Sequence, residues 1–354
     1  MKHLLLLFAL ILPVSFANAQ DTYTISGVVK DATGKGIQSA TVFIAGSEKA
    51  TMTNAEGNFT FKSINSGTYQ LVVNMLSYVP VKQNVIVNDK AEIVSITLTE
   101  KQTMLNEVVV GGKKSKDESH LKTFTKYFMG ESANAKACKI INPEIIDFST
   151  AKNTLKAATY DFLEIENNNL GYRIKYLLKS FQYDNKTDVT LYDGDCVFEN
   201  MDGTPEQKAL WVANRKKTYE GSLMHFLRSV YANNSRQEGF LVYLTRSDFF
   251  PLSIGPNPVV AEQIVKRVDN NFLNFRFKKR LYVVFDKKKA AKEDKVVNDD
   301  SWIVSDIPDN GSLFMVDSQV DRRGSYSNYN KLLIQGSFGK KRIGDQLPLE
   351  YVPE

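Results

Sequence analysis

The chain has 354 residues, and its 45 basic and 40 acidic side chains give a formal net charge of +5. This small excess of positive charge is spread along the chain, which argues against nucleic acid or an anionic membrane surface as the partner. The length suits two domains of ordinary size.

The first residues have the pattern of a secretory signal peptide. Lys2 precedes an apolar run from Leu4 to Val14, and the small residues Ala17-Asn18-Ala19 follow it. This pattern predicts export and cleavage after residue 19. The apolar run is shorter than the ~20 residues of a membrane-spanning helix, so we expect no transmembrane helix after cleavage. The expected location is the periplasm of a Gram-negative bacterium, or an association with its outer membrane.

Residues 20–110 have the pattern of short β-strands separated by tight turns. Glycine-containing turns follow the strands predicted around Ile25–Val29 and Ala40–Ile44, while Phe59 and Phe61 alternate with polar residues. Glycine, Asn and Asp supply the positive φ angles that such turns need, and the alternation places one face of each strand in a core. The frequent turns predict a small antiparallel β-sandwich.

This first segment resembles the carboxypeptidase-regulatory-like, or transthyretin-like, domain of bacterial cell-envelope proteins. The matching stretches are Gly27–Val29, Gly36–Val42, Thr53–Phe59 and Gly67–Leu71. The resemblance implies a β-sandwich that acts as a docking or adhesion module. Asn54 stands where the family usually has aspartate, and this weakens any cation site based on that carboxylate.

The resemblance does not extend to a peptidase. A zinc carboxypeptidase needs a His-x-x-Glu pair and a distant third ligand. After cleavage only His120 and His225 remain, and neither is followed by Glu at that spacing. We therefore expect no catalytic residues, no metal site and no cofactor.

A short segment at the end of this first domain is made of Glu107, Val108, Val109 and Val110. We predict that it is a closing strand of the first domain and that its edge can pair with a partner chain. Residues 111–119 are polar, charged and led by two glycines, which predicts a linker. Residues 120–354 are then the second domain.

Strand patterns in the second domain occur at residues 170–178 and 275–285, where apolar side chains largely alternate with polar ones, and at residues 239–244, which form an apolar run. Apolar side chains at helical spacing predict a short helix over residues 121–128. The domain is therefore predicted to be α+β, with an antiparallel sheet and packed helices. Stretches of it resemble the C-terminal region of uncharacterised exported proteins that carry the same first domain, and this resemblance implies no chemistry.

A longer helix is predicted from Thr204 to about residue 231. Thr204 can cap it, Pro205 suits its first turn and Gln207 completes a capping box, while Gly221 can break it in two. The side chains predicted to form its buried stripe are Trp211, Tyr219, Ser222, Phe226 and Val230. His225 lies about 130° from the centre of that stripe, so we expect an edge-of-core histidine and no catalytic base. No G-x-S-x-G motif is present.

Acidic side chains cluster along one stretch of the second domain: Asp184, Asp188, Asp193, Asp195, Glu199 and Asp202. Their spacing does not match a calcium-binding EF-hand loop. Hairpin turns at Asp193-Gly194 and Asp202-Gly203 explain the pattern more simply.

The chain has two cysteines, Cys138 and Cys196. In an exported protein they predict either a disulfide or two buried free thiols. Tyr172, Tyr176 and Tyr183 alternate along a predicted strand, which favours partly buried core residues over a glycan- or peptide-binding surface.

These patterns lead to one functional prediction and one alternative. We predict an exported, non-enzymatic cell-envelope protein whose β-sandwich docks to another envelope protein or a glycan. The alternative is an envelope hydrolase or glycan-processing enzyme with a carboxylate-based site in the second domain, which would need two facing acids in a cleft.

Overall fold

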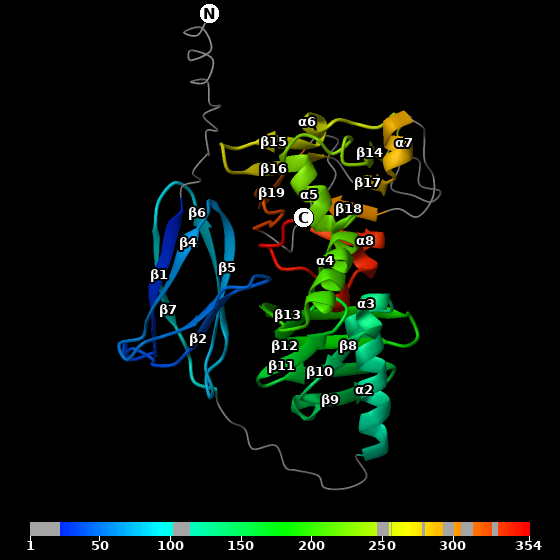
Figure 1. The fold of residues 1–354 in the computed structure, drawn as a ribbon. Coiled ribbons are helices and arrows are strands. Elements are labelled where there is room, and N and C mark those ends of the chain that lie inside the picture. Colours follow the sequence, from blue (N-terminus) through cyan, green and yellow to red (C-terminus); the bar gives the residue numbers. More distant parts are fainter. Residues whose placement is uncertain are drawn as a thin grey trace, which may run out of the picture.

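The computed structural model describes residues 22–101, 114–245, 255, 257–277, 280–292, 301–305, 314–327 and 332–354. The predicted signal peptide and the predicted partner edge from Glu107 to Val110 lie outside the described residues. Figure 1 shows a β-sandwich lobe beside a larger lobe of sheets and helices. The predicted fold class, mainly β plus α+β, is confirmed.

The sandwich consists of two sheets packed face to face. Its strands are β1 (Tyr23–Lys30), β2 (Thr41–Ile44), β3 (Ala50–Met52), β4 (Asn58–Ile64), β5 (Gly67–Asn74), β6 (Val81–Val87) and β7 (Glu92–Thr97). One sheet has the order β4-β1-β7 and the other β3-β2-β5-β6. Ile25, Val29, Phe61 and Leu71 are among the side chains of the core between them. The pairing is antiparallel as predicted, except that β7 runs parallel to β1.

The larger lobe begins with a sheet that is covered by helices on one face. The strands of this sheet are β8 (Cys138–Ile140), β9 (Ile146–Ala151), β10 (Thr154–Thr159), β11 (Phe162–Asn167), β12 (Tyr172–Asp184) and β13 (Val189–Asn200). Helix α2 (Lys114–Met129) begins inside the stretch that was predicted as a linker and packs Phe124 and Phe128 against this sheet. The short helices α3 (Ala133–Lys136) and η1 (Pro143–Ile145) connect it to the first strands.

Two further sheets complete the larger lobe. They have the orders β14-β17-β18-β20 and β15-β16-β19. The strands are β14 (Phe240–Leu244), β15 (Val265–Arg267), β16 (Leu273–Phe277), β17 (Arg280–Phe285), β18 (Ser301–Ser305), β19 (Phe314–Val320) and β20 (Leu332–Gly336). The helices are α4 (Pro205–Tyr219), α5 (Leu223–Tyr231), α6 (Ala261–Ile264), α7 (Lys287–Lys292), α8 (Ser337–Lys340) and η3 (Ile343–Asp345).

The predicted helix break at Gly221 is confirmed. Thr204 and Gln207 form the capping box of α4, and the chain then turns at Gly221, whose φ is +66°. Ser222 was predicted to lie on the buried stripe, and this is wrong. It is the N-cap of α5, with its hydroxyl accepting a hydrogen bond from the backbone N–H of His225. The break resets the helical phase, so a wheel drawn through both halves misplaces residues near it.

Two other predictions need correction. Residues 275–285 form two strands, β16 and β17, which belong to different sheets. The alternation of apolar residues continues from Phe277 to Leu281 because their separation of four keeps the same parity, and it hides the change of sheet. The two predicted hairpin turns are also wrong. Asp193-Gly194 is part of β13, opposite a register shift in β12, and Asp202-Gly203 connects β13 to helix α4. Gly194 is needed in β13 because a Cβ would lie 2.4 Å from the ring of Tyr176.

The sandwich sheet that faces the larger lobe is buried on both sides. Val73 and Leu71 point into the sandwich core, while Val72 and its neighbour Phe43 on β2 pack against Leu177 and Val197 of the larger lobe (Figure 1). This explains why almost every residue of β5 is buried, with no alternation between buried and exposed positions. The sandwich is therefore attached through the outer face of its second sheet.

Candidate functional site

A buried polar network joins the sandwich to the larger lobe. The Asp321 carboxylate is fully buried and accepts a hydrogen bond from the backbone N–H of Thr68 on β5, at 2.9 Å. Arg323 pairs with this carboxylate at 2.7 Å and donates to the Thr68 carbonyl oxygen at 2.6 Å. The Thr68 hydroxyl also lies 3.1 Å from that of Ser325. Since every partner is satisfied, the network fixes the orientation of the sandwich.

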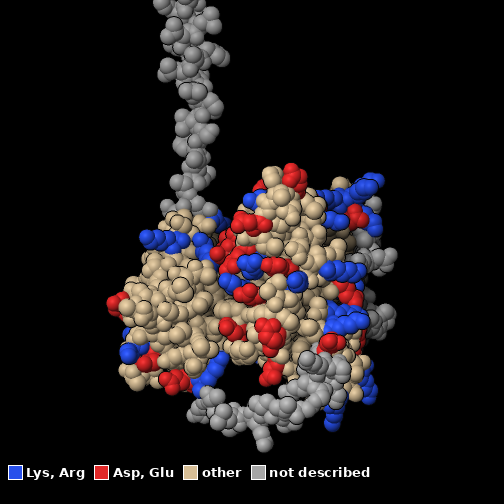
Figure 2. Space-filling model, turned by 60° about the horizontal axis from the view of Figure 1, so that its bottom comes forward, with Lys and Arg blue, Asp and Glu red and all other residues tan. Residues whose placement is uncertain are grey.

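A second set of contacts lies along the edge of β13. The Gly46 N–H donates to the Cys196 carbonyl oxygen at 2.7 Å, and the Phe198 N–H donates to the Ser47 carbonyl oxygen at 2.9 Å. Lys82 of β6 forms an ion pair with Asp195 at 2.7 Å. Figure 2 shows charged side chains of both signs gathered where the two lobes meet. The sandwich thus covers an edge of the larger lobe's sheet, which would otherwise expose its backbone groups.

The opposite sheet of the sandwich leaves an edge uncovered. Strand β7 pairs with β1 on one side, and it has no second strand neighbour among the described residues. Its outward-facing side chains include Ile93, which is 82% exposed, and Ser95. Figure 2 shows a face of the sandwich lobe whose middle carries no charged side chain. After Glu92 at its start, β7 carries no charged side chain, so most of this edge lacks the usual protection against pairing with another chain.

His225 is a structural residue of the core. It is more deeply buried than we predicted, since the sequence placed it at the edge of the core. Its Nδ1 accepts a hydrogen bond from the Gly221 N–H at 3.1 Å, and its Nε2 lies 3.1 Å from a carboxylate oxygen of Glu238. Its ring contacts those of Tyr219 and Phe240. Burial lowers the pKa of His225, and the nearby Glu238 carboxylate only partly opposes this. The neutral ring therefore holds the junction between α4 and α5.

The predicted acidic cluster is dispersed along the β12–β13 hairpin. Asp193 and Asp195 pair with lysines, Glu199 pairs with Lys175 and Asp184 accepts backbone N–H groups of its turn. Within the part of the chain that the structure describes, no group of three or more His, Cys, Asp or Glu side chains is arranged to hold a metal ion. These acids are occupied by structural contacts.

The two cysteines are free thiols. Cys138 lies on β8 and Cys196 on β13, with strands β11 and β12 between them. Strands are spaced by about 4.8 Å, so the two Cα atoms are well beyond the reach of a disulfide. Burial raises the pKa of each thiol to about 12. Both are therefore free thiols in the structure, with Cys196 buried and Cys138 partly buried, and neither is a good nucleophile.

The three tyrosines on β12 are core residues. Tyr172, Tyr176 and Tyr183 are all buried. Tyr172 is stacked under the guanidinium of Arg215, at 3.8 Å from the ring centroid. Their ring faces are therefore not available as a recognition surface for a glycan or peptide.

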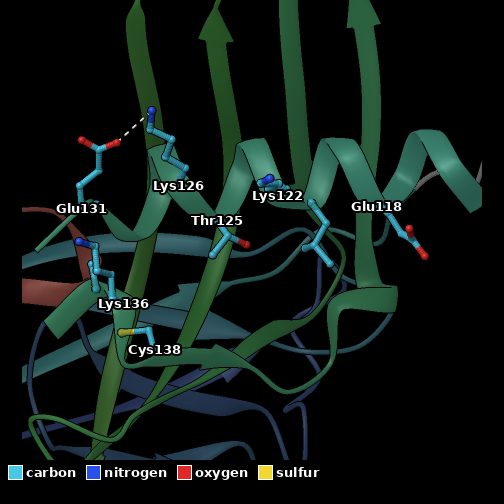
Figure 3. A pocket seen from close by; sticks show the side chains of 10 residues that line it. Glu118, Lys122, Thr125, Lys126, Glu131, Lys136 and Cys138 are labelled. Carbon is cyan, nitrogen blue, oxygen red and sulfur yellow. Dashed lines mark ion pairs between the residues drawn. The ribbon is translucent and has the colours of Figure 1, made fainter. Parts of the chain in front are cut away.

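A groove of about 770 Å³ lies beside α2. Figure 3 shows Lys122, Thr125 and Lys126 along the helix, with Lys136 and Cys138 on the opposite wall. Its acids do not face each other, because Glu131 is directed to Lys126, at 3.0 Å, while Glu118 points away at the far end (Figure 3). The facing carboxylates that the alternative enzyme would need are not found here.

The residues that join the two lobes were missed by the sequence analysis. Asp321 and Arg323 lie in a turn. The sequence of a turn does not reveal that its carboxylate will be buried, or that its hydrogen-bond partner lies 253 positions away. Val72 did leave a signal, since it interrupts the alternation of β5 with a second buried face. The pattern indicates that both faces of β5 are buried, but it does not indicate that one of them contacts another lobe.

None of the described helices is both long enough and apolar enough to cross a membrane. Residues 25–110 match the family model of the CarboxypepD_reg-like domain, which confirms the resemblance predicted from the sequence. No curated protein matches the chain.

Two solved structures illustrate how distant the structural likenesses are. The backbone protein of pilus 2b from group B streptococcus has a TM-score of 0.20 and 17% identity, with 22% of this chain and 41% of that chain covered. Catechol 1,2-dioxygenase from Acinetobacter sp. ADP1 has a TM-score of 0.22 and 11% identity, with 28% and 59% covered. The chain thus spans about half the length of these proteins, and likenesses at this level say nothing about its function.

Proposed function

We propose that the CarboxypepD_reg-like domain at residues 25–110 is a docking module of an exported cell-envelope protein. Its ligand would be an extended segment of another envelope protein, which adds a strand to the edge of β7 that has no strand partner among the described residues. This mode of recognition obtains affinity from main-chain hydrogen bonds and specificity from the side chains on one face. We also propose that residues 120–354 form a second domain, whose role is to hold the sandwich in a fixed orientation.

The observation that carries this proposal is the exposed edge of β7. Every second backbone N–H and C=O of an edge strand points away from its one neighbour and lacks a strand partner. Ile93 lies on that strand with 82% of its surface exposed, beside uncharged residues of β1 and β4 such as Val28 and Thr60. The opposite sheet is occupied by the larger lobe, so only the β4-β1-β7 sheet presents its outer face to a partner (Figure 1).

The experiment compares two edge strands of the same sandwich. The variant Ile93→Lys places a charge on β7, and the matched control Met52→Lys places one on β3, where Met52 is 67% exposed. Each protein is used to capture partners from envelope extracts, and the complex is then examined by hydrogen–deuterium exchange. We expect a partner that is lost with Ile93→Lys, is kept with Met52→Lys and slows exchange at residues 92–97.

Two results would contradict the docking proposal. One is a partner whose binding is unaffected by Ile93→Lys. The other is a complex that leaves exchange at residues 92–97 unchanged and slows it elsewhere, because strand addition must protect the amides of the strand to which it adds.

A further inference from the structure

A pocket of about 360 Å³ lies where the sandwich meets the larger lobe, apart from the β7 edge. Its walls come from both sides. The sandwich contributes Lys49 and the end of β4, while the larger lobe contributes Arg228 of α5, the turn at Arg322 and Arg323, and the C-terminal segment at Glu350. Figure 1 shows this C-terminal segment running beside the sandwich. The pocket therefore exists only when the two lobes are docked.

The pocket has more positive charge than its own acids neutralise. Among the described residues, Arg323 is paired with the buried Asp321, whereas no ion pair is found for Lys49, Arg228 or Arg322. A guanidinium that is partly buried and has no carboxylate partner produces a strong positive electrostatic field, because the local dielectric is low. This leaves three unpaired cations around one hollow.

Arg228 is held rigidly at the base of this arrangement. Its Nε donates to the Arg323 carbonyl oxygen at 2.9 Å, Nη1 to that of Tyr351 at 2.6 Å and Nη2 to that of Leu349 at 3.1 Å. Carbonyl oxygens satisfy its hydrogen bonds but do not cancel its charge. Arg228 thus supplies a fixed positive field, and Arg322 and Lys49, which make no side-chain hydrogen bond within the described residues, have donors free for a ligand.

We propose that this pocket binds a small molecule that carries a phosphate group. Phosphate brings close to two negative charges at neutral pH and three acceptor oxygens, which match several converging cations better than a single carboxylate does. The volume of about 360 Å³ is within the range of pockets that enclose small organic ligands, so a phosphate ester fits as well as the free ion. Glu350 is the acid in the wall, and it opposes the ligand's charge.

Binding is measured by isothermal titration of the intact mature protein with inorganic phosphate and with glucose 6-phosphate. Chloride at the same ionic strength is the control for general screening. A third titration uses phosphatidylcholine vesicles that contain phosphatidic acid, and this distinguishes a lipid phosphate from a soluble one. Saturable binding of any of these phosphates supports the proposal, and binding of none of them overturns it.

Three variants test whether the ligand occupies this pocket. Arg322→Gln and Lys49→Gln should each weaken phosphate binding by about tenfold, the loss expected for one charge-assisted hydrogen bond. Glu350→Gln should tighten binding, because it removes the opposing charge and keeps an acceptor for the Glu48 N–H. Arg267→Gln alters an exposed arginine outside the pocket and serves as the matched control, with unchanged affinity.

The opposite signs of these effects make the test independent of folding. A variant that merely loosened the protein would weaken binding whichever charge was removed. Equal affinity in Arg322→Gln and Arg267→Gln, or weaker binding in Glu350→Gln, would place the ligand elsewhere and overturn the proposal. The result for the β7 edge is separate, since Ile93→Lys should bind phosphate as the unmodified protein does.

Discussion

The carboxylate of Asp321 accepts a hydrogen bond from the backbone N–H of Thr68 across 253 positions of sequence, and both residues are buried where the sandwich meets the larger lobe. Arg323 neutralises the carboxylate and returns to the Thr68 carbonyl oxygen. The buried charge of Asp321 is stable only when Thr68 and Arg323 are in place, and this requirement fixes the position of the sandwich.

Asp321→Asn should be strongly destabilising. It leaves Arg323 without its counter-charge in a buried site, and breaking a buried pair in this way typically costs about 3 to 5 kcal/mol. Urea denaturation measures the change in the free energy of unfolding. Glu92→Gln removes the partly buried partner of the exposed Lys90, 3.8 Å away, and should cost less than about 0.5 kcal/mol. Equal costs in the two variants would show that the Asp321 network is not important for stability.

Gly221→Ala should destabilise more than Gly34→Ala. Both glycines have positive φ, +66° and +88°, so alanine is strained at both, at about 1 kcal/mol. At Gly221 the added Cβ would also lie 2.5 Å from the ring of Phe285, whereas at Gly34 it meets nothing within 4 Å. We expect about 1 to 3 kcal/mol of additional loss at Gly221. Thermal unfolding of the two variants tests this, and similar melting temperatures would contradict it.

The protein should lose stability as the pH falls below neutrality, in part because of His225. Burial holds the pKa of His225 below its ordinary value of 6.5, so the unfolded state takes up the proton first as the pH is lowered. The contribution of the neutral ring is complete above pH 6.5 and is lost as the pH falls through the folded-state pKa. Protonation would also displace the Gly221 N–H from Nδ1.

Two variants isolate this effect in denaturation curves measured between pH 7.5 and pH 5 at about equal ionic strength. His225→Gln should remove its part of the pH dependence. Glu238→Gln should increase the pH dependence, because the lost carboxylate is the group that favours the protonated ring. A decrease with Glu238→Gln would mean that the sign of this coupling is wrong.

Both cysteines should titrate as thiols without any reductant, but only after unfolding. The pKa of each is raised to about 12 by burial, so little thiolate is present in the native protein at pH 8. We expect iodoacetamide to modify the native protein slowly and the denatured, unreduced protein at both Cys138 and Cys196. Mass spectrometry counts the added groups, and a denatured protein that takes up none contains the disulfide.

Local sequence rules were reliable where neighbouring residues decide the structure. The capping box at Thr204, the break at Gly221 and the turns of the sandwich depend on residues only a few positions apart, and the structure has them as predicted. The same rules failed where one local pattern is compatible with two different structures. The alternation across residues 275–285 continues through a change of sheet, and Asp193-Gly194 has the composition of a turn but serves as a strand against the Tyr176 ring.

The sequence by itself determined the sandwich and its family, because alternation, turn chemistry and the matched motifs are written in consecutive residues. Only the tertiary structure decided which residues of the larger lobe contact the sandwich. Val72 and Phe43 face the larger lobe, Asp321 finds Thr68 and the cations around Arg228 converge on one pocket because segments far apart in the chain are packed together. Burial and charge pairing at such contacts depend on the folded neighbours, and no local pattern records them.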